Sequence, residues 1–383
     1  MWPFNPPSLS AGLFVVANKA LFISNAVSDQ LWKNFKTPLP LFACPSSFFF
    51  LITGQGPARK VLYAPEVRDA DQQCQCPING LFTMATIISV ASGKGGVGKS
   101  IVAGNLGLVL ARMGKRVVLV DLDVGGADLH IMFGLLHPPA TLSDFLMRRV
   151  QSLDAVAYPI STQAGLRLIP GTGETLATAN MPYAKKKRLI RHLSQMEADV
   201  LIVDVGAGTG YHALDFFLLA DLHIVVSTPD PTSVLDLYRF IKLASIRRVL
   251  SHFLSSNPLN ATLADGDYAS LEEMFLASGK ADEAAQTIAR EVLESFRPLL
   301  VLNRTSSRSK VNTLQLQKLL RQYVGGELAL LGEIPDDRAV EQSVRTYLPV
   351  VESAPESTAA LAFVGLAQQI ASHLRTQHNR GAA

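Results

Sequence analysis

The sequence has few cysteines, and all of them lie in its first fifth. Its 383 residues include Cys44, Cys74 and Cys76, so the chain from residue 77 onward has no cysteine. That part can hold neither a disulfide nor a thiolate-bound metal. Cys74 and Cys76 are separated by one residue, which is closer than the usual C-x₂-C spacing of a metal-binding pair.

The chain also lacks a strong charge of one sign and a long apolar segment. Its formal net charge is +3, which gives no general signal for a polyanion partner. Hydrophobic residues make up 48% of the chain. However, no uninterrupted apolar run approaches the ~20 residues that a membrane-spanning helix needs. The length is sufficient for one large α/β domain with appendages.

The first 83 residues differ from the rest. They are rich in proline and phenylalanine, contain both tryptophans, and show little helical or strand periodicity. We interpret residues 1–83 as a poorly structured N-terminal extension of a domain at 84–383. The interpretation that we favour is that this extension is not native, because Met84 stands two residues before the first expected strand. Translation from an upstream start would add such a tail.

Two other interpretations of this extension remain open. It can be a disordered segment that binds a partner. It can also be a targeting segment, because Lys33 and Lys36 precede the apolar stretch Ser46–Gly54.

From Thr86 onward, apolar β-branched runs alternate with helical patterns. This alternation predicts an α/β, doubly wound and mainly parallel sheet with helices on both faces. Strands are expected at Thr86–Ser92, Arg116–Asp123, Gly165–Gly171, Asp199–Gly210, Asp221–Pro231, Arg297–Ser307 and Ala329–Asp337. Helices are expected at Ile101–Gly114, Thr232–Leu250, Thr313–Tyr323 and Thr358–Leu374. An insertion at about 251–296 is expected to hold a polar loop and two short helices.

The glycine-rich segment between the first strand and the first helix carries the clearest chemical signal. Gly93–Ser100 reads GKGGVGKS, which contains the phosphate-loop pattern G-x-x-x-x-G-K-[ST]. Backbone N–H groups of such a loop surround phosphate oxygens, and the dipole of the following helix favours an anion. Lys99 is expected to reach the β- and γ-phosphates, and Ser100 to bind Mg²⁺. The nucleotide contacts are expected from Gly93, Lys94, Gly95, Gly96, Val97, Gly98, Lys99 and Ser100.

Three aspartates fall where strands are expected to end. Asp121 and Asp123 come at the end of the second strand, and Asp204 follows a buried run of Leu, Ile and Val. Ligands of doubly wound sheets bind at the carboxyl ends of the strands, so these carboxylates are candidates for a metal site. The alternatives are a solvent-exposed pair at a strand end, or an N-cap for the segment after Asp123.

Lys94 follows the first glycine of the loop, where a plain phosphate loop needs no lysine. The resulting K-G-G-x-G-K-[ST] form resembles the loop of the MinD/ParA ATPases, which belong to the SIMIBI class of P-loop proteins. This resemblance implies the cofactors ATP and Mg²⁺ and an ATP-dependent homodimer in which Lys94 reaches the partner's nucleotide. The alternative is a solvent-exposed lysine in an ordinary loop.

Other motifs of that family follow in order. DLDVGGADLH, beginning at Asp121, resembles switch I, which implies that Asp121 organises the Mg²⁺ shell and Asp123 positions the attacking water. Asp204 and the following VGAGTG resemble switch II, which implies that Asp204 belongs to the outer shell of the Mg²⁺ site. Asn303 and Arg304 resemble the adenine-recognition position; an asparagine amide can pair with both edges of adenine, although asparagine also caps turns. The predicted catalytic residues are Lys94, Lys99 and Asp123, and the predicted metal residues are Ser100, Asp121 and Asp204.

The later part of the chain most resembles the flagellar-number regulators FlhG, FleN and YlxH. This resemblance rests on LGEIPDDRAVEQSVRTYLPV, residues 331–350, and PDPTSVLDLYRFIKL, residues 229–243. It implies a slow ATPase, regulated by a protein partner, that sets the number or placement of a flagellum or division site. We expect it in the cytoplasm or peripherally at the inner membrane. A membrane contact would lack the usual anchor, because only RTQHNRGAA follows the last expected helix.

Proteins with other functions share this form of the loop. Iron–sulfur cluster carriers and electron-transfer ATPases need cysteines in the ATPase domain, and this chain has none there. A ParA-type DNA-partitioning ATPase is the alternative function. The basic run AKKKRLIRH at 184–192 would then contact DNA; we instead expect it to form the solvent-exposed face of a helix. With so balanced a charge, DNA is not expected as a partner.

Overall fold

The chain separates into two compact units, Met1–Thr83 and Met84–Ala383. The computed structural model describes residues 85–382 except 124–125, 162–164, 172–180, 257–267, 269, 282, 307–313, 315–316, 319–320 and 322–326. In the first unit it describes four short strands, which form two antiparallel pairs that the sequence analysis does not predict. They are β1 (Phe14–Val16) with β2 (Ala20–Phe22), and β3 (Phe49–Thr53) with β4 (Lys60–Ala64). The three interpretations of this unit stay predictions.

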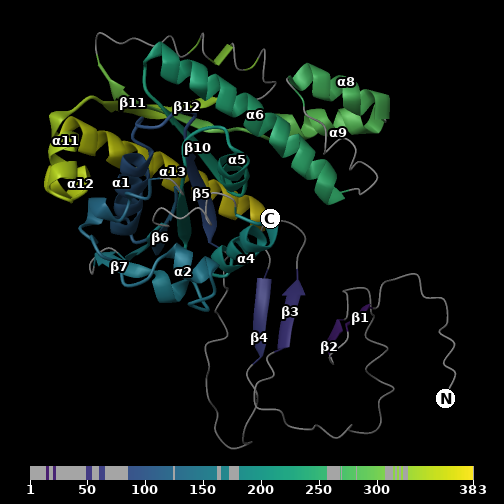
Figure 1. Cartoon of the computed structure of the whole chain (residues 1–383), viewed down its shortest axis with the longest axis horizontal. Helices are drawn as coiled ribbons and strands as arrows, with labels where there is room; N and C mark the ends of the chain where they lie inside the picture. Colours follow the sequence, from purple (N-terminus) through teal and green to yellow (C-terminus); the bar gives the residue numbers. More distant parts are fainter. Residues whose placement is uncertain are drawn as a thin grey trace, which may run out of the picture. The chain divides into compact units, whose positions relative to one another are not determined.

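The second unit contains an eight-stranded sheet in the order β12-β11-β10-β5-β9-β6-β8-β7 (Figure 1). Its strands are β5 (Thr86–Ala91), β6 (Val117–Leu122), β7 (Tyr158–Ser161), β8 (Leu166–Ile169), β9 (Val200–Val205), β10 (Leu222–Ser227), β11 (Leu299–Thr305) and β12 (Ala329–Pro335). Every pairing is parallel except that of β7 with β8. The central strands β6, β9 and β10 are buried at every position, because helices cover both faces of a parallel sheet.

The helices form two apolar layers, one on each face of the sheet. They are α1 (Lys99–Arg112), α2 (Leu142–Leu146), α4 (Tyr183–Leu193), α5 (Tyr211–Leu218), α6 (Pro231–Ser256), α8 (Leu271–Ala281), α9 (Glu283–Glu294), α11 (Arg338–Arg345), α12 (Val350–Ser353) and α13 (Thr358–Ala382). Two short 3₁₀ turns, η2 (Ile131–Phe133) and η3 (Asp154–Val156), complete the described elements. One core cluster joins α1, α12 and α13 to the sheet, and the other joins α2, α4, α5, α6, α8 and α9 to it.

The predicted fold class is confirmed, although several elements differ from those expected. For example, α13 was expected to end at Leu374 and continues to Ala382. β7 was not predicted, because Pro159 interrupts a run of only four residues; proline is tolerated there because β7 is an edge strand. α6 runs six residues beyond Leu250, because Phe253 continues the apolar helical face and is buried. The two helices expected in the insertion are α8 and α9, whereas the helix expected at Thr313–Tyr323 falls largely outside the described residues.

Candidate nucleotide-binding site

The phosphate loop connects β5 to α1, as its sequence predicts. Gly98 precedes the first residue of α1 and has a φ of 94°, in the left-handed region that favours glycine. A Cβ on Gly93 would lie 2.1 Å from the carbonyl oxygen of Asp236 in α6, so no side chain fits there. The two glycines therefore allow the loop backbone to curl tightly and to pack directly against a neighbouring helix.

The loop lysine lies beside the acidic end of β6. Lys99 is the first residue of α1 and is only 7% exposed, and its Nζ lies 3.6 Å from Oδ2 of Asp123. The segment after β9 reaches the same point, because a Cβ on Gly206 would lie 3.3 Å from Oδ1 of Asp123. The structure thus brings together the phosphate loop and the two segments that resemble switch I and switch II.

Two buried aspartates lie side by side behind this ion pair. Asp121 of β6 and Asp204 of β9 occupy paired positions in the parallel register. The Asp121 carboxylate accepts hydrogen bonds from the backbone N–H of Asp123 (3.0 Å) and of Leu129 (3.2 Å). Neither carboxylate oxygen of Asp204 receives a hydrogen bond of normal geometry from the residues that the structure describes. The sheet therefore holds one carboxylate in place and leaves the other without a firm hydrogen-bond partner.

Burial dominates the electrostatics of this pair. It raises the pKa of Asp121 well above its ordinary value, and the neighbouring charge of Asp204 raises it further. Burial likewise raises the pKa of Asp204 to about 6, while Lys99 and the Ser100 hydroxyl oppose the rise. Both carboxylates would be stabilised in their charged form by a cation.

The donor set fits Mg²⁺ that binds together with a nucleotide. Mg²⁺ usually takes one or two carboxylates and completes its shell with phosphate oxygens and water. Ser100, Asp121 and Asp204 supply the required oxygen atoms at the start of α1 and the ends of two neighbouring strands. Within the described ranges, no group of three or more His, Cys, Asp or Glu side chains could hold a metal.

Lys94, the other lysine of the loop, lies at the surface. Its side chain is exposed, and its Nζ donates a hydrogen bond to Oγ1 of Thr232 at the start of α6 (2.9 Å). Its backbone carbonyl accepts a hydrogen bond from the Ser92 hydroxyl (2.7 Å). The Ser92 carbonyl in turn accepts one from the N–H of Gly208, beyond β9 (3.1 Å). Thr232 and Ser92 were not predicted, because nothing in their local pattern distinguishes them from other hydroxyl residues.

Asn303 and Arg304 lie at the end of β11, next to the phosphate loop. The Asn303 amide nitrogen donates to the carbonyl of Val97 (2.8 Å), and its amide oxygen accepts from the N–H of Arg304 (3.0 Å). Arg304 is exposed and has a φ of 56°. The structure thus places Asn303 beside the loop, whereas adenine contacts of either residue stay a prediction.

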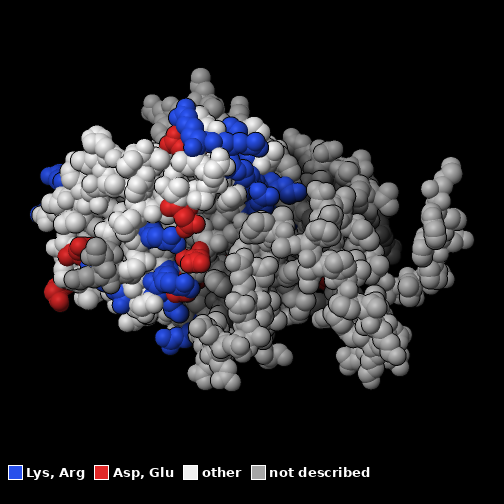
Figure 2. All heavy atoms as spheres, turned by 90° about the horizontal axis from the view of Figure 1, so that it is seen from below, with Lys and Arg blue, Asp and Glu red and all other residues white. Residues whose placement is uncertain are grey.

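The expectation that the basic run at 184–192 forms a solvent-exposed face is wrong for two of its residues. Lys186 of α4 is buried and pairs with Asp215 of α5, which also pairs with Arg247 of α6. Arg188 places its guanidinium 4.1 Å from the ring centroid of Phe145. Long cationic side chains can bury their aliphatic parts between helices while their charged groups find partners on other elements. The sequence of a basic run does not reveal such partners. Other Lys and Arg side chains do gather on the molecular surface (Figure 2).

Comparison with protein families places this site in a known class. The fold and the loop define a P-loop NTPase. A model of the ParA family, described as "NUBPL iron-transfer P-loop NTPase", matches residues 83–318. This match covers more than half of the chain, so the chain belongs to the ParA family of P-loop NTPases.

Relatives in this family include an antiactivator and proteins named as site-determining for the flagellum or the septum. Antiactivator FleN of Pseudomonas aeruginosa is 28% identical over 297 residues, which cover 77% of this chain and 89% of FleN. The flagellum site-determining protein YlxH of Helicobacter pylori is 33% identical, with 41% of this chain and 53% of YlxH covered. The septum site-determining protein MinD of Bacillus subtilis is 36% identical, with 42% of this chain and 59% of MinD covered. The predicted resemblance to MinD/ParA and FleN/YlxH proteins is confirmed.

Solved structures show the same fold. MinD of Pyrococcus horikoshii, complexed with Mg-ADP, has a TM-score of 0.53 and 23% identity, and 75% of this chain and 96% of that chain are covered. MinD of Pyrococcus furiosus also has a TM-score of 0.53 and 23% identity, with 76% and 99% covered. Among the residues that the structure describes, no helix is both long enough and apolar enough to cross a membrane.

Proposed function

We propose that this protein is an ATPase switch of the MinD/ParA type that regulates the number or placement of a flagellum or division site. The observation that carries the proposal is the meeting of Lys99 with Asp123 beside the buried pair Asp121 and Asp204. Phosphoryl transfer from ATP to water needs positioned charges more than a strong base, and this site supplies them. The names of YlxH and MinD, which are site-determining proteins of the flagellum and the septum, support the cellular role.

Each group of residues has a distinct role in this proposal. The loop amides and Lys99 bind the phosphates, and Ser100, Asp121 and Asp204 hold Mg²⁺. The metal neutralises charge on the β- and γ-phosphate oxygens when it is bound. Asp123 orients the attacking water. Its carboxylate faces Lys99 here, and a bound phosphate would draw the lysine away from it. Asn303 and Arg304 are the proposed residues near adenine.

The proposed switch is an ATP-dependent homodimer. Lys94 is exposed on the loop, and its Nζ makes an exposed hydrogen bond to Thr232, which costs little to break. Its ammonium can therefore reach a nucleotide held by a second copy of the chain. Hydrolysis would then remove the γ-phosphate state that stabilises the dimer and release a regulatory protein partner. Such a protein would act in the cytoplasm or at the inner-membrane surface.

Replacing Lys94 tests the switch. Lys94→Ala should leave the affinity for ATP within about twofold, because the buried Lys99 remains, but should abolish the dimer formed with ATP and Mg²⁺. Light scattering with and without ATP measures the dimer, and isothermal titration measures the affinity. Lys187→Ala, which removes an exposed lysine of α4, is the matched control and should dimerise normally. A Lys94→Ala protein that dimerises like the wild type would refute the proposal.

The alternative functions have less support. A DNA-partitioning ATPase needs a basic surface, yet Lys186 and Arg188 of the basic run serve helix packing. Iron–sulfur transfer, which the description of the family model names, needs ligands for a cluster. Residues 83–318, which that model matches, contain no cysteine thiolate to bind one.

A further inference from the structure

The end of β11 is irregular where it passes the phosphate loop. Asn303 pairs with Ile334 of β12, and Thr305 pairs with the next residue of that strand, so the register shifts by one residue at Arg304. Arg304 has a φ of 56°, a left-handed conformation that is uncommon for arginine. Such a β-bulge bends a strand and redirects its side chains, and bulges are frequent next to functional sites.

A hydrogen bond between the adjacent residues Asn303 and Arg304 accompanies the bulge. The N–H of Arg304 donates to the amide oxygen of Asn303 (3.0 Å), which fixes the orientation of the Asn303 amide group. Its nitrogen then points at the phosphate loop and donates to the carbonyl oxygen of Val97 (2.8 Å), 206 residues away in the chain. Asn303 is 6% exposed, so water does not readily replace this bond.

The loop and the amide are also in close steric contact. A Cβ on Gly98 would lie 2.3 Å from the amide nitrogen of Asn303, so the backbone of Gly98 lies directly against that side chain. Gly98 is the last residue before α1 and has a φ of 94°. The Asn303 amide therefore contacts the loop at the turn that leads from Val97 into Lys99 and Ser100.

The geometry of one peptide unit shows what this contact does. The carbonyl of Val97 and the N–H of Gly98 belong to the same planar trans peptide, so they point in opposite directions. A hydrogen bond that draws the carbonyl toward β11 therefore turns the N–H of Gly98 away from β11. Without that bond, the carbonyl could rotate toward the phosphate site, where its negative dipole would repel the ligand.

We propose that Asn303 is a positioning residue that holds the Val97–Gly98 peptide in its phosphate-binding orientation. The proposal rests on the proposed function, since it assumes that the loop binds ATP. It assigns the Asn303 amide to the loop, whereas the family resemblance assigns it to adenine. The two roles predict different responses to a change in the nucleotide base.

The test compares two buried asparagines of similar structural role. Asn303→Ala removes the bond to Val97, and Asn303→Asp additionally places a carboxylate oxygen against the Val97 carbonyl. Asn105→Ala is the matched control. The Asn105 amide joins the Ile101 carbonyl (2.8 Å) to the N–H of Val351 (3.1 Å) and is also buried, and both of these partners lie outside the loop Gly93–Ser100. All three variants should lose thermal stability.

The affinity for two nucleotides, each measured with Mg²⁺, then distinguishes contact with the loop from contact with adenine. The two nucleotides are ATP and purine riboside triphosphate, which lacks the amino group of adenine. Asn303→Ala should weaken both by the same factor, about tenfold, and Asn303→Asp by more. Asn105→Ala should stay within about twofold of the wild type for both.

Two results would overturn the inference. One is a loss confined to ATP, which would assign the amide to the base. The other is a loss by Asn303→Ala no larger than that of Asn105→Ala, which would leave only a structural role. A wild-type protein that binds neither nucleotide would instead refute the proposed function.

Discussion

β6 and β9 lie side by side in the sheet, and each carries a charged residue at both of its ends. At their amino ends, Arg116 and Asp199 form an ion pair. At their carboxyl ends, Asp121 and Asp204 are two like charges buried next to each other. The same two strands therefore compensate charge at one end and accumulate it at the other.

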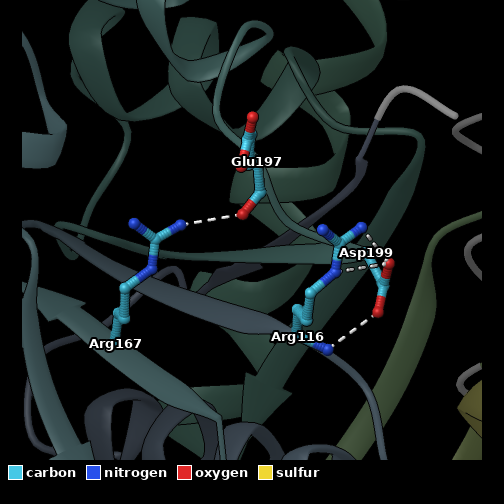
Figure 3. Close-up of polar contacts among 4 residues, drawn as sticks. All are labelled: Arg116, Arg167, Glu197 and Asp199. Carbon is cyan, nitrogen blue, oxygen red and sulfur yellow. Dashed lines mark hydrogen bonds and ion pairs between the residues drawn. The ribbon is translucent and has the colours of Figure 1, made fainter. Parts of the chain in front are cut away.

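The amino ends show how the chain satisfies an aspartate (Figure 3). Asp199 accepts from the Arg116 backbone N–H (2.8 Å) and from two nitrogens of its guanidinium (2.8 and 3.2 Å). Partial burial alone would raise the pKa of Asp199, but these hydrogen bonds and the charge of Arg116 outweigh it and hold the pKa below its ordinary value. Nearby, Arg167 donates to the Glu197 carbonyl (2.8 Å).

The carboxyl ends show the opposite arrangement. The raised pKa values of Asp121 and Asp204 mean that the folded state disfavours their charged forms in the absence of a cation. Structures often give up stability at sites that must bind a ligand. The comparison indicates that the proposed ligand site lies at the carboxyl ends, where Asp204 lacks a firm hydrogen-bond partner among the described residues. The amino ends, where Arg116 and Asp199 are paired, are arranged for stability.

The largest expected effect comes from replacing one aspartate at each end of β9. At pH 7 without nucleotide, Asp204→Asn should raise the free energy of unfolding, by up to about 3 kcal/mol, because it removes a buried charge whose pKa is about 6. Its ATP hydrolysis should fall roughly 10- to 100-fold. Asp199→Asn should instead lower the free energy of unfolding by about 1 kcal/mol, since the pair is partly exposed, and leave hydrolysis unchanged.

Urea unfolding and phosphate release measure both quantities for these two variants and the wild type. Stability changes of the same sign in Asp204→Asn and Asp199→Asn would contradict the comparison. An unchanged hydrolysis rate in Asp204→Asn would remove that residue from the proposed site.

A second effect, on stability alone and varying with pH, is expected from a buried histidine near the amino end of β10. Burial lowers the pKa of His223 to about 4, and its Nε2 has no hydrogen-bond partner among the described residues. The folded state therefore takes up this proton less readily than the unfolded chain. The stabilisation is present above about pH 6.5 and is lost as the pH falls toward 4, a change of roughly 3 kcal/mol at most.

His223→Leu should remove this part of the pH dependence, because leucine has no proton to bind and fits between Phe217 and Phe296. The check is the free energy of unfolding at several values between pH 4 and 7. His137→Leu, at an exposed position, should keep the wild-type slope. If the two variants and the wild type share one slope, His223 does not titrate as described. A confirmed slope would show that a buried titratable side chain, His223, also lies near the amino ends of the strands, with its Nε2 unpartnered among the described residues.

The smallest effect is expected at Arg167, which pairs with Asp154 (2.8 Å) at the protein surface. Arg167→Met should lower the free energy of unfolding by about 0.5 kcal/mol, because exposed ion pairs contribute little. A double-mutant cycle with Asp154→Asn isolates the pair from the bond to the Glu197 carbonyl. A coupling above about 2 kcal/mol would mean that this end of the sheet depends on Arg167 more than its exposure suggests.

Local patterns in the sequence were sufficient to predict most of the fold and the centre of the site. The apolar runs of β5, β6 and β9 determine strands, and glycines between a strand and a helix determine a phosphate loop. The position of Asp121 and Asp204 at one edge of the sheet also followed from the sequence, because parallel strands end at one edge. That the two residues are neighbours did not, because it depends on the pairing of β6 with β9. The roles of Lys186 and Arg188 were wrongly predicted, since their partners Asp215 and Phe145 lie on other helices.

The sequence by itself determined the alternation of strands and helices, the phosphate loop and the identities of its acidic partners. These features depend on periodicity and backbone conformation, which neighbouring residues set. Only the tertiary structure decided that Asn303 donates to Val97 and that Lys94 contacts Thr232. It also decided that Asp199 is paired with an arginine, whereas Asp204 lacks a hydrogen bond of normal geometry among the described residues. Such differences depend on which side chains from distant segments come within hydrogen-bonding distance, and on how much water remains around them.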